Sequence, residues 1–501
     1  MKKTTVKTVA SVTLITALGS TGYLAANGAP PVAAAPNAAA VQKLDAQTHY
    51  SDEDLKWDSS DEEAIDLANP TAIDGVSVEN GTITITSGGT YRLTGEYSGQ
   101  VKIDAAKTDT VRLVLDNAKI TNSTGAALNV VSAAEAIIYT AAGTTNTVAD
   151  EANYTATGDD DPDAAIYSTA NLTLAGEGSL SVEGAYEEGI HTTGGLVIAS
   201  GTLEVNAANT GIKGKDYVDI TGGIVNVTAA QDGIKSTNTD DENKGFTRLS
   251  DGSVTISAGD DGLKAPRTLE ISGGTLNIEK SNEGIEAQYI NILDGDVTVN
   301  STDDGINASL KDSSSDTSSD TTSGTAITGQ QTQQNQNGQV QQAPAGGGTA
   351  PGGSQGSTGQ NQNMPQPPTD GAMPGGGGGI FEVVDAAINI SGGTVTVNAE
   401  GDGIDSNGTA TFSGGTVTVN GPTAGGNNAL DSNGDLLLNG GTVTTGSTAD
   451  MFEAPSSAST SGYLKITDSS ALTQGSTVQV TDSSGTVVAN YKITKSGVQL
   501  V

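Results

Sequence analysis

Short runs in which apolar and polar residues alternate recur along most of the chain. Residues 82–86 (TITIT) and 111–115 (VRLVL) are two examples. Alternation with a period of two places the apolar side chains of a strand on one face, so these runs predict half-buried β-strands. Clusters of Gly, Ser, Asn and Asp separate the runs and predict tight turns. The chain is therefore expected to be all-β.

The predicted strands belong to a repeat. In each unit, one apolar residue follows a small residue, usually glycine. These positions are separated by 24, 22, 22, 29, 22, 21, 98 and 26 residues, so the period is close to 22. The positions are Ile166, Ile190, Ile212, Ile234, Leu263, Ile285, Ile306, Ile404 and Leu430. A typical unit, residues 261–282, holds three short strands and three turns, and one turn is Gly-Gly.

The repeat predicts a right-handed parallel β-helix with coils of about 22 residues. One coil has too little inward apolar surface for a core, whereas coils stacked at ~4.8 Å bury a continuous ladder of Ile, Leu and Val. The leucine-rich repeat is the main rival at this period. Its Leu-x-x-Leu-x-Leu pattern and its helical segment are not visible in the sequence, and the nonapeptide calcium roll has a different period.

Changes in composition divide the chain into segments. A basic start followed by an apolar stretch and small residues predicts a secretory signal sequence, and hence a secreted or cell-surface protein. A long Ser-, Gln-, Pro- and Gly-rich segment interrupts the repeat and is expected to be disordered. The expected segments are a signal sequence at 1–26, a flexible spacer and acidic N-terminal region at 27–70, the first part of the β-helix at 71–309, a low-complexity insertion at 310–379, the continued β-helix at 380–460 and a small C-terminal β cap at 461–501.

Charge and cysteine content exclude several classes of function. Acidic residues outnumber basic ones by 59 to 22, and the formal net charge of −37 excludes a basic nucleic-acid footprint. The chain has no cysteine, which excludes disulfides, thiolate metal sites and thiol catalysis. Aromatic residues make up only 3%, which disfavours a flat aromatic platform for cellulose.

Two residues precede each Gly-Ile step, and in several coils both are acidic. Stacked carboxylates about 5 Å apart repel by roughly 1 kcal/mol per pair in water, so a column of them favours bound cations. Calcium fits better than magnesium because it accepts six to eight oxygen ligands in flexible geometry. Turn formation alone is the alternative and explains one acid, but not two. The candidate calcium ligands are Asp232, Asp260, Asp261, Glu283, Asp303, Asp304 and Asp402.

The residue after the apolar one forms a second column, which is expected to point outward. Three successive coils place lysine there, and such a strip beside bound calcium predicts binding of a polysaccharide that carries acidic sugars. An ordinary solvated surface, with lysines in ion pairs to the acids, is the alternative. The candidate carbohydrate-binding residues are Lys213, Lys235, Lys264 and Arg267.

From about residue 76 onward, the chain resembles the bacterial carbohydrate-binding β-helix domains related in shape to pectate lyases. The matching motifs are residues 89–95 (GTYRLTG), 164–168 (AAIYS), 176–182 (GEGSLSV) and 211–216 (GIKGKD), together with the Asp-Gly-Ile-Lys steps. The resemblance implies a calcium-containing protein that binds cellulose and acidic sugars. Asn209-Thr210 stands where neighbouring coils carry acids, which puts a cation site at that coil in doubt.

Two other functions stay open at this stage. A pectate-lyase-like enzyme would use calcium and a Lys or Arg base, for which Lys213, Lys235, Lys264 and Arg267 are the candidates. A surface spacer or adhesin would have no sugar specificity. Hydrolysis by a carboxylate pair is less favoured, because the regular repetition of the acids is typical of a structural role. We expect a non-catalytic, monomeric polysaccharide binder.

Overall fold

The computed structural model describes residues 44–155, 158, 161–310, 382–449, 451–467, 472–481 and 483–501. The predicted signal sequence at 1–26 and residues 311–379 of the predicted insertion lie outside these residues. No helix of the described residues has the length and apolarity needed to cross a membrane.

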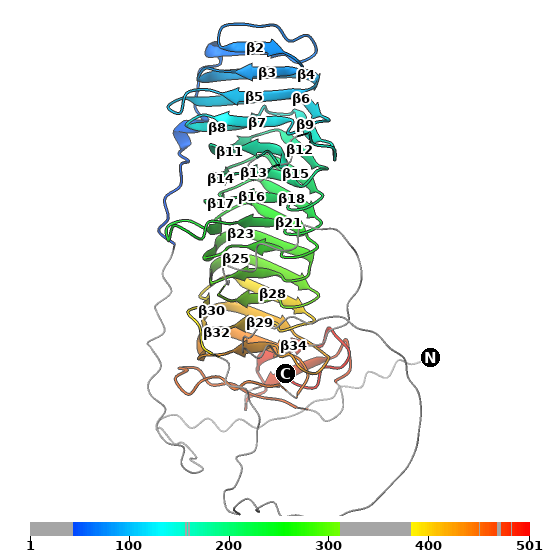
Figure 1. The fold of residues 1–501 in the computed structure, drawn as a ribbon. Coiled ribbons are helices and arrows are strands. Elements are labelled where there is room, and N and C mark those ends of the chain that lie inside the picture. The colour runs from blue at the N-terminus through cyan, green and yellow to red at the C-terminus, as the bar shows by residue number, and fades with distance from the viewer. Residues whose placement is uncertain are drawn as a thin grey trace, which may run out of the picture. The chain divides into compact units, whose positions relative to one another are not determined.

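In some coils, including the unit at residues 261–282, one long strand takes the place of the second and third predicted strands. Other coils contain three short strands, as the repeat predicts. In one coil these are β16 (Ile212–Gly214), β17 (Tyr217–Ile220) and β18 (Ile224–Ala229). The next strand, β19 (Ile234–Ser236), pairs in parallel with β16, so one turn of the chain advances one step along the stack (Figure 1). The predicted fold class, a right-handed parallel β-helix, is confirmed.

One face of the stack is a sheet of 13 mostly two- to five-residue strands, which we call the short-strand sheet. Its first two strands pair antiparallel and the others pair in parallel. Besides β16 and β19, its strands are β2 (Val76–Glu79), β3 (Thr82–Ile85), β5 (Gln100–Asp104), β7 (Leu128–Ser132), β10 (Ala164–Ser168), β13 (Glu188–Thr192), β22 (Leu263–Lys264), β24 (Ile285–Ala287), β26 (Ile306–Ala308), β29 (Ile404–Ser406) and β31 (Leu430–Ser432).

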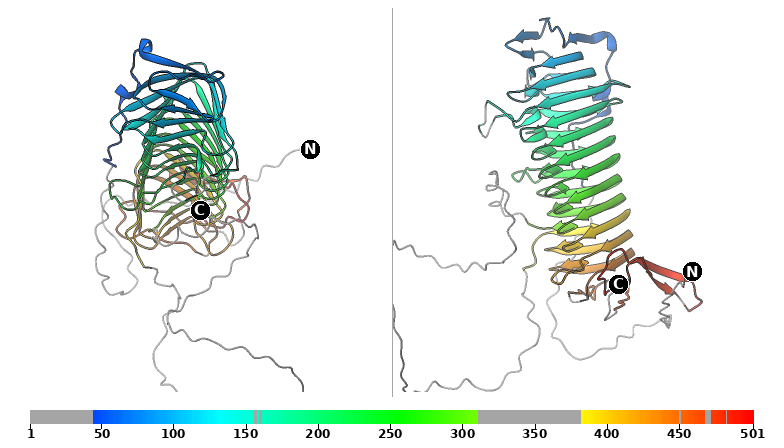
Figure 2. Two further views of the ribbon diagram at one scale, coloured as in Figure 1. Left: turned by 45° about the horizontal axis from the view of Figure 1, so that its top comes forward. Right: turned by 90° about the vertical axis from the view of Figure 1, so that its right-hand side faces the viewer.

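The other faces form one sheet of 19 strands, the long-strand sheet, in which the longest strands bridge two faces. Figure 2 shows its strands stacked along the helix axis. Besides β17 and β18, its strands are β1 (Glu62–Asp66), β4 (Gly89–Ser98), β6 (Thr110–Asn122), β8 (Glu135–Thr140), β9 (Thr145–Asp150), β11 (Asn171–Gly176), β12 (Ser179–Gly184), β14 (Gly195–Ile198), β15 (Thr202–Ala207), β20 (Phe246–Leu249), β21 (Ser253–Ser257), β23 (Thr268–Ser281), β25 (Tyr289–Ser301), β27 (Ala387–Ile390), β28 (Thr394–Ala399), β30 (Thr409–Asn420) and β32 (Leu436–Gly446).

The apolar residue of each repeat lies directly above that of the next coil. Ile212, for example, pairs with Ile190 on one side and with Ile234 on the other, and all three are fully buried. Ile306 pairs directly with Ile404, so the repeat continues across the step of 98 residues. These residues and the inward residues of the long-strand sheet form one continuous core.

The Gly-Gly turns need glycine at their second position. Gly274 has a φ of +73°, which residues with a side chain rarely adopt. A Cβ atom at this position would lie 2.7 Å from the carbonyl oxygen of Gly252 in the preceding coil. The turn therefore allows successive coils to approach closely at this corner.

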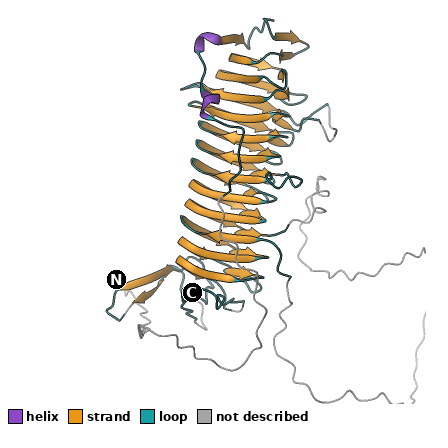
Figure 3. Ribbon diagram, turned by 90° about the vertical axis from the view of Figure 1, so that its left-hand side faces the viewer, coloured by secondary structure: helices purple, strands orange, loops and turns teal. Residues whose placement is uncertain are grey.

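Two further segments complete the described structure. Residues 44–61, which we call the N-terminal strap, include the 3₁₀ helices η1 (Asp52–Leu55) and η2 (Ser59–Asp61) and lie along the long-strand sheet (Figure 3). The strap and β1 fall inside the segment at 27–70 that was expected to be a spacer and an acidic region. At the other end, β33 (Thr477–Thr481) and β34 (Val487–Lys492) form the antiparallel hairpin of the predicted cap. Tyr491 of the cap donates a 2.8 Å hydrogen bond to Asn420.

Candidate ligand-binding site on the acid column

The residues before the glycine of each repeat, or before Ala429 in the last repeat, stack into a column, which we call the acid column. Each glycine N–H donates to the carbonyl oxygen of the acid-column residue one coil further on, as from Gly211 to Asp232 and from Gly305 to Asp402. The residues after the apolar position pair in register and form the outer column. The acid column is Glu188, Thr210, Asp232, Asp261, Glu283, Asp304, Asp402 and Asn428, and the outer column is His191, Lys213, Lys235, Lys264, Glu286, Asn307, Asp405 and Asp431.

Each lysine of the outer column forms an ion pair with the acid column. The Nζ atom of Lys213 lies 3.1 Å from Glu188 Oε1, and that of Lys235 lies 2.9 Å from Asp232 Oδ2. Lys264 contacts Asp261. These side chains are largely buried; those of Lys264 and Asp261 are 17% and 3% exposed. The predicted strip of lysines is present, and each of its lysines forms an ion pair with a neighbouring carboxylate.

Three groups of side chains bring metal-binding atoms within 4.8 Å of one another in the described part of the chain. The first two contain the predicted ligands Asp232, Asp260, Asp261 and Glu283, joined by Glu286. Their donors are all carboxylate oxygens, which suit a hard cation such as Ca²⁺. The third group is Asp163, Glu188 and His191.

The acid column continues toward the C-terminal end without lysine. We call Glu283, Asp304, Asp402, Asp405 and Glu453 the lysine-free acid run, because none of them forms an ion pair with any residue that the structure describes. Asp304 Oδ1 accepts a 2.7 Å hydrogen bond from the Asp402 N–H, and Asp402 accepts one from the Asn428 N–H. Glu453 Oε2 accepts a 2.7 Å hydrogen bond from the Ser432 N–H.

Burial and mutual repulsion raise the pKa values of the carboxyl groups in this run, so these groups lose their protons less readily. Burial, followed by the charges of Asp304, Asp402 and other acids, raises the pKa of Asp405 to about 7. Burial is also the largest cause for Asp304 and Asp402, whose pKa values rise to about 6. The pKa values of Glu283 and Glu453 rise to about 7 and 8, again mainly through burial. A divalent cation would relieve this repulsion.

Two predicted site residues lie apart from these contacts. Asp303 is exposed, whereas Asp304 beside it is half-buried. Arg267 lies between β22 and β23 and donates a 2.8 Å hydrogen bond to the carbonyl oxygen of Thr239.

In the coil of Asp402, glycine occupies the first of the two positions that precede the Gly-Ile step. A Cβ atom on Gly401 would lie 2.7 Å from the backbone carbonyl carbon of Asp303 and 2.5 Å from Oδ1 of both Asp303 and Asp304. The doubled acid is therefore sterically excluded from that coil.

Sequence reasoning did not select Asp163, Glu286, Asp405 and Glu453. Glu286 and Asp405 carry a signal in the sequence, because they occupy the outer column that the repeat defines. Asp163 precedes β10 and Glu453 follows β32, both in irregular segments. Since neither position belongs to the periodic pattern, only the fold brings these two carboxyl groups to the column.

Residues 79–326 match the model of a family described as carbohydrate-binding domain-containing protein. A protein of Acetivibrio thermocellus with the same description is 34% identical over 145 residues, which cover 28% of this chain and 51% of that protein. The matched region thus spans about half the length of this relative. A solved structure described as a polysaccharide lyase-like protein from C. thermocellum, gadolinium derivative, is 32% identical, with a TM-score of 0.42, covering 47% of this chain and 99% of that chain. The resemblance predicted from the sequence is confirmed.

Proposed function

We propose that the protein, whose residues 79–326 match the model of the carbohydrate-binding domain family, is a secreted, calcium-dependent binder of an acidic polysaccharide such as polygalacturonate. The observation that carries the proposal is the change along the acid column. Lysines pair with the carboxylates as far as Lys264, whose charge also acts on Glu283. Beyond Glu283, no member of the lysine-free acid run forms an ion pair with a cation among the described residues.

Calcium fits the donors that the column provides. The predicted ligands Asp304 and Asp402 belong to the lysine-free acid run, and Asp405 and Glu453 add carboxylates from neighbouring positions. Ca²⁺ accepts carboxylate, carbonyl and water oxygens in variable geometry, which a ladder of carboxylates and turn carbonyls supplies. Asp232, Asp260 and Asp261 are also close enough to share an ion, but there Lys235 and Lys264 already provide positive charge.

The lysines are proposed to select acidic sugars together with the bound calcium. A uronate carboxylate can share a lysine with the acid column or coordinate calcium directly. Direct capture by lysine alone is disfavoured, because the uronate must compete with Glu188 and Asp232, which lie 3.1 and 2.9 Å from the lysine nitrogens, and with Asp261 beside Lys264. Retention of an acidic polymer is therefore expected to depend on calcium.

The state of the lysines favours a binder over a polysaccharide lyase. Burial works to lower the pKa of Lys213, but the charges of Glu188 and Asp163 outweigh it and raise the pKa. Carboxylates raise the pKa of Lys264 in the same way. A lysine that stays protonated at neutral pH is a poor base for abstracting a proton. A spacer without sugar specificity remains the alternative from another class.

The test is a pull-down of the purified mature chain with polygalacturonate and with cellulose, each with and without a calcium chelator, while unsaturated products are measured. Retention on polygalacturonate that needs calcium and yields no product supports the proposal. Unsaturated product would favour the lyase. No retention on either polymer would favour the spacer.

A further inference from the structure

The N-terminal end of the acid column holds a group of side chains that the proposed calcium sites do not use. It consists of Asp163, Glu188 and His191, whose metal-binding atoms lie within 4.8 Å of one another. Unlike the two all-carboxylate groups, this group contains an imidazole. The chain has no cysteine and only two histidines, so nitrogen and sulfur ligands for a metal ion are scarce in it.

The stacked coils fix the three side chains relative to one another. Glu188 and His191 belong to β13, which pairs in parallel with β10, and Asp163 directly precedes β10. The Glu188 N–H donates a 3.0 Å hydrogen bond to the carbonyl oxygen of Asp163. Tyr167 of β10 packs edge-on against the imidazole, with 5.2 Å between ring centroids. The backbone ladder and this ring contact therefore position the group in advance, as a metal site requires.

The imidazole of His191 is oriented by a carboxylate. Its Nδ1 donates a 2.5 Å hydrogen bond to Asp163 Oδ1. Among the residues that the structure describes, its Nε2 has no hydrogen-bond partner. The ring proton can therefore move to Nε2, which leaves Nδ1 and Asp163 Oδ1 both able to coordinate an ion between them.

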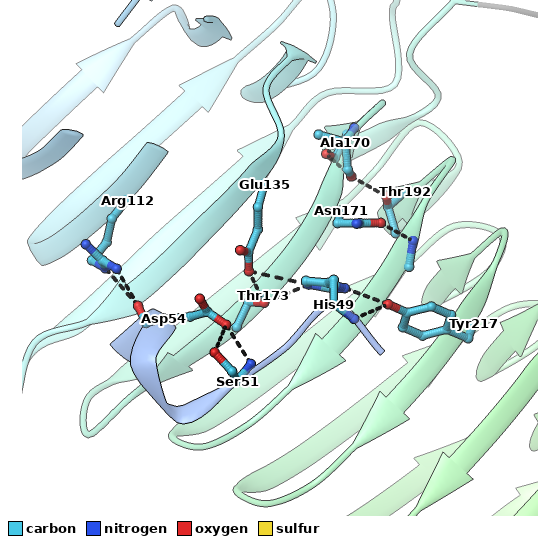
Figure 4. Close-up of polar contacts among 12 residues, drawn as sticks. His49, Ser51, Asp54, Arg112, Glu135, Ala170, Asn171, Thr173, Thr192 and Tyr217 are labelled. Carbon is cyan, nitrogen blue, oxygen red and sulfur yellow. Dashed lines mark hydrogen bonds and ion pairs between the residues drawn. The ribbon is translucent and has the colours of Figure 1, made fainter. Parts of the chain in front are cut away.

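The second histidine, His49 of the N-terminal strap, has no ring nitrogen to offer. Its Nδ1 lies 2.7 Å from the Tyr217 hydroxyl, and its Nε2 lies 2.9 Å from Thr173 Oγ1. Figure 4 shows the His49 imidazole between these two side chains. Because both nitrogens already have hydroxyl partners, His49 holds the strap in place and serves as an internal control for His191.

Glu188 carries the observation that favours a bound ion over ion pairs alone. Its side chain is 4% exposed, and its Oε1 lies 3.1 Å from the Nζ atom of Lys213. Its Oε2 is buried and has no hydrogen-bond partner in the described part of the chain. A buried carboxylate oxygen without a partner is costly, because it loses its hydration and gains no contact in exchange. A metal ion beside Glu188 would supply the missing contact.

Lys213 reaches this group from the next coil. Lys235 and Lys264 pair with the acid three positions earlier in their own coils. In the coil of Lys213 that position is Thr210, so the lysine reaches back to the preceding coil. There its Nζ lies 3.7 Å from Asp163 Oδ2, and its side chain is 22% exposed. The flexible ammonium can therefore turn toward solvent when a divalent ion takes its place.

We propose that Asp163, Glu188 and His191 bind one divalent first-row transition-metal ion such as Zn²⁺. A mixed set of imidazole and carboxylate ligands suits these ions, whereas Ca²⁺ prefers oxygen ligands alone. Three protein ligands leave the fourth position of a tetrahedral zinc ion to water. The ion links the segment before β10 to the following coil.

This site is separate from the calcium sites of the proposed function. Its three residues precede Lys235, whereas the lysine-free acid run begins at Glu283. The inference therefore does not rest on the proposed function. Loss of polygalacturonate retention would overturn the proposed function and leave the transition-metal site intact, and the reverse also holds.

The test is titration calorimetry of the mature chain with zinc chloride in excess calcium, which competes for the all-carboxylate groups. One zinc ion per chain is expected to bind. His191→Gln is expected to weaken zinc binding at least about tenfold. Glu204→Gln, on an exposed position of the long-strand sheet, is expected to leave it unchanged. Lys213→Gln is expected to strengthen it, because the substitution removes the competing ammonium. Circular dichroism establishes that each variant is folded.

A second measurement on the unaltered chain covers failure of a variant to fold. Because the chain has only two histidines, their imidazole NMR signals can be assigned through contacts with Tyr167 and Tyr217. Zinc is expected to shift the signals of His191 and to leave those of His49 in place. Zinc binding that shifts neither imidazole would overturn the inference. So would equal zinc affinity in folded His191→Gln, weaker binding in Lys213→Gln, or weak binding at many surface carboxylates only.

Discussion

The Nζ atom of Lys264 lies 3.0 Å from Oε2 of Glu286, and this is the last ion pair between the outer column and its neighbours toward the C-terminal end of the described β-helix. On the N-terminal side of this pair, each lysine neutralises carboxylates of the column. On the other side, carboxyl groups with raised pKa values face one another. This boundary separates a structural part of the column from a part suited to bind cations.

Asp405→Asn is expected to weaken calcium binding about tenfold, or about 1.4 kcal/mol. Asp405 is half-buried and lies within reach of the charges of Asp304, Asp402 and Glu283, so it is part of an accumulation of negative charge. Titration calorimetry with calcium measures the effect. Asp296→Asn, on an exposed position of the long-strand sheet, is the matched control and should leave the affinity unchanged. Equal affinity for the Asp405 variant and the control would contradict the assignment.

Lys264→Gln is expected to have the opposite effect. The substitution removes the positive charge beside Asp261 and Glu286, whose carboxylates belong to groups with metal-binding spacing. Calcium should then bind more tightly, or with one additional ion per chain, and the gain should disappear on further substitution of Glu286 with Gln. A variant that binds calcium like the unaltered chain would show that Lys264 does not limit the site.

The stability of the cation-free protein is expected to fall as the pH rises from about 4 to about 8. The pKa values of Glu283, Asp304, Asp402, Asp405 and Glu453 are raised in the folded protein, so over this range the folded state holds protons that the unfolded chain releases. The free energy of unfolding therefore decreases with pH. Thermal melts in a chelating buffer measure the slope, which should be shallower in Asp405→Asn. Identical slopes for the unaltered chain and the Asp405→Asn variant would contradict the assignment of the pH dependence to these carboxyl groups.

Deleting residues 312–380 is expected to leave the β-helix folded. The deletion reduces the step from Ile306 to Ile404 to 29 residues, the same as the step from Ile234 to Leu263. The direct pairing of Ile306 with Ile404 shows that the stack is continuous at this point. The melting temperature and the calcium affinity should match those of the full chain. A loss of cooperative unfolding would show that the deleted residues support the stack.

Ile404→Ala is expected to lower the free energy of unfolding by about 2–5 kcal/mol, because it opens a cavity in a fully buried ladder. Thr416→Ala, on an exposed face of β30, should change stability by less than about 0.5 kcal/mol. Chemical denaturation of both variants provides the comparison. A small loss for the Ile404 variant would contradict the continuity of the core across the insertion.

The sequence predicts the stack and its two columns closely, because both follow from the repeat. The register of Lys213, Lys235 and Lys264 is confirmed pair by pair. The strap could not be predicted, since residues 44–61 have no period and His49 meets Thr173 and Tyr217 more than a hundred positions away. The repeat also does not predict which carboxylates pair with the lysines. Side-chain direction decides whether a lysine faces solvent or its own column.

The most direct test of the central claim is the retention of the mature chain on polygalacturonate, measured with calcium, with a chelator, and for the Asp402→Asn/Asp405→Asn variant. Strong retention with calcium is expected, with loss of retention in chelator and weakened retention of the variant at limiting calcium. Retention that persists unchanged in the chelator and in the variant would contradict the role assigned to the lysine-free acid run.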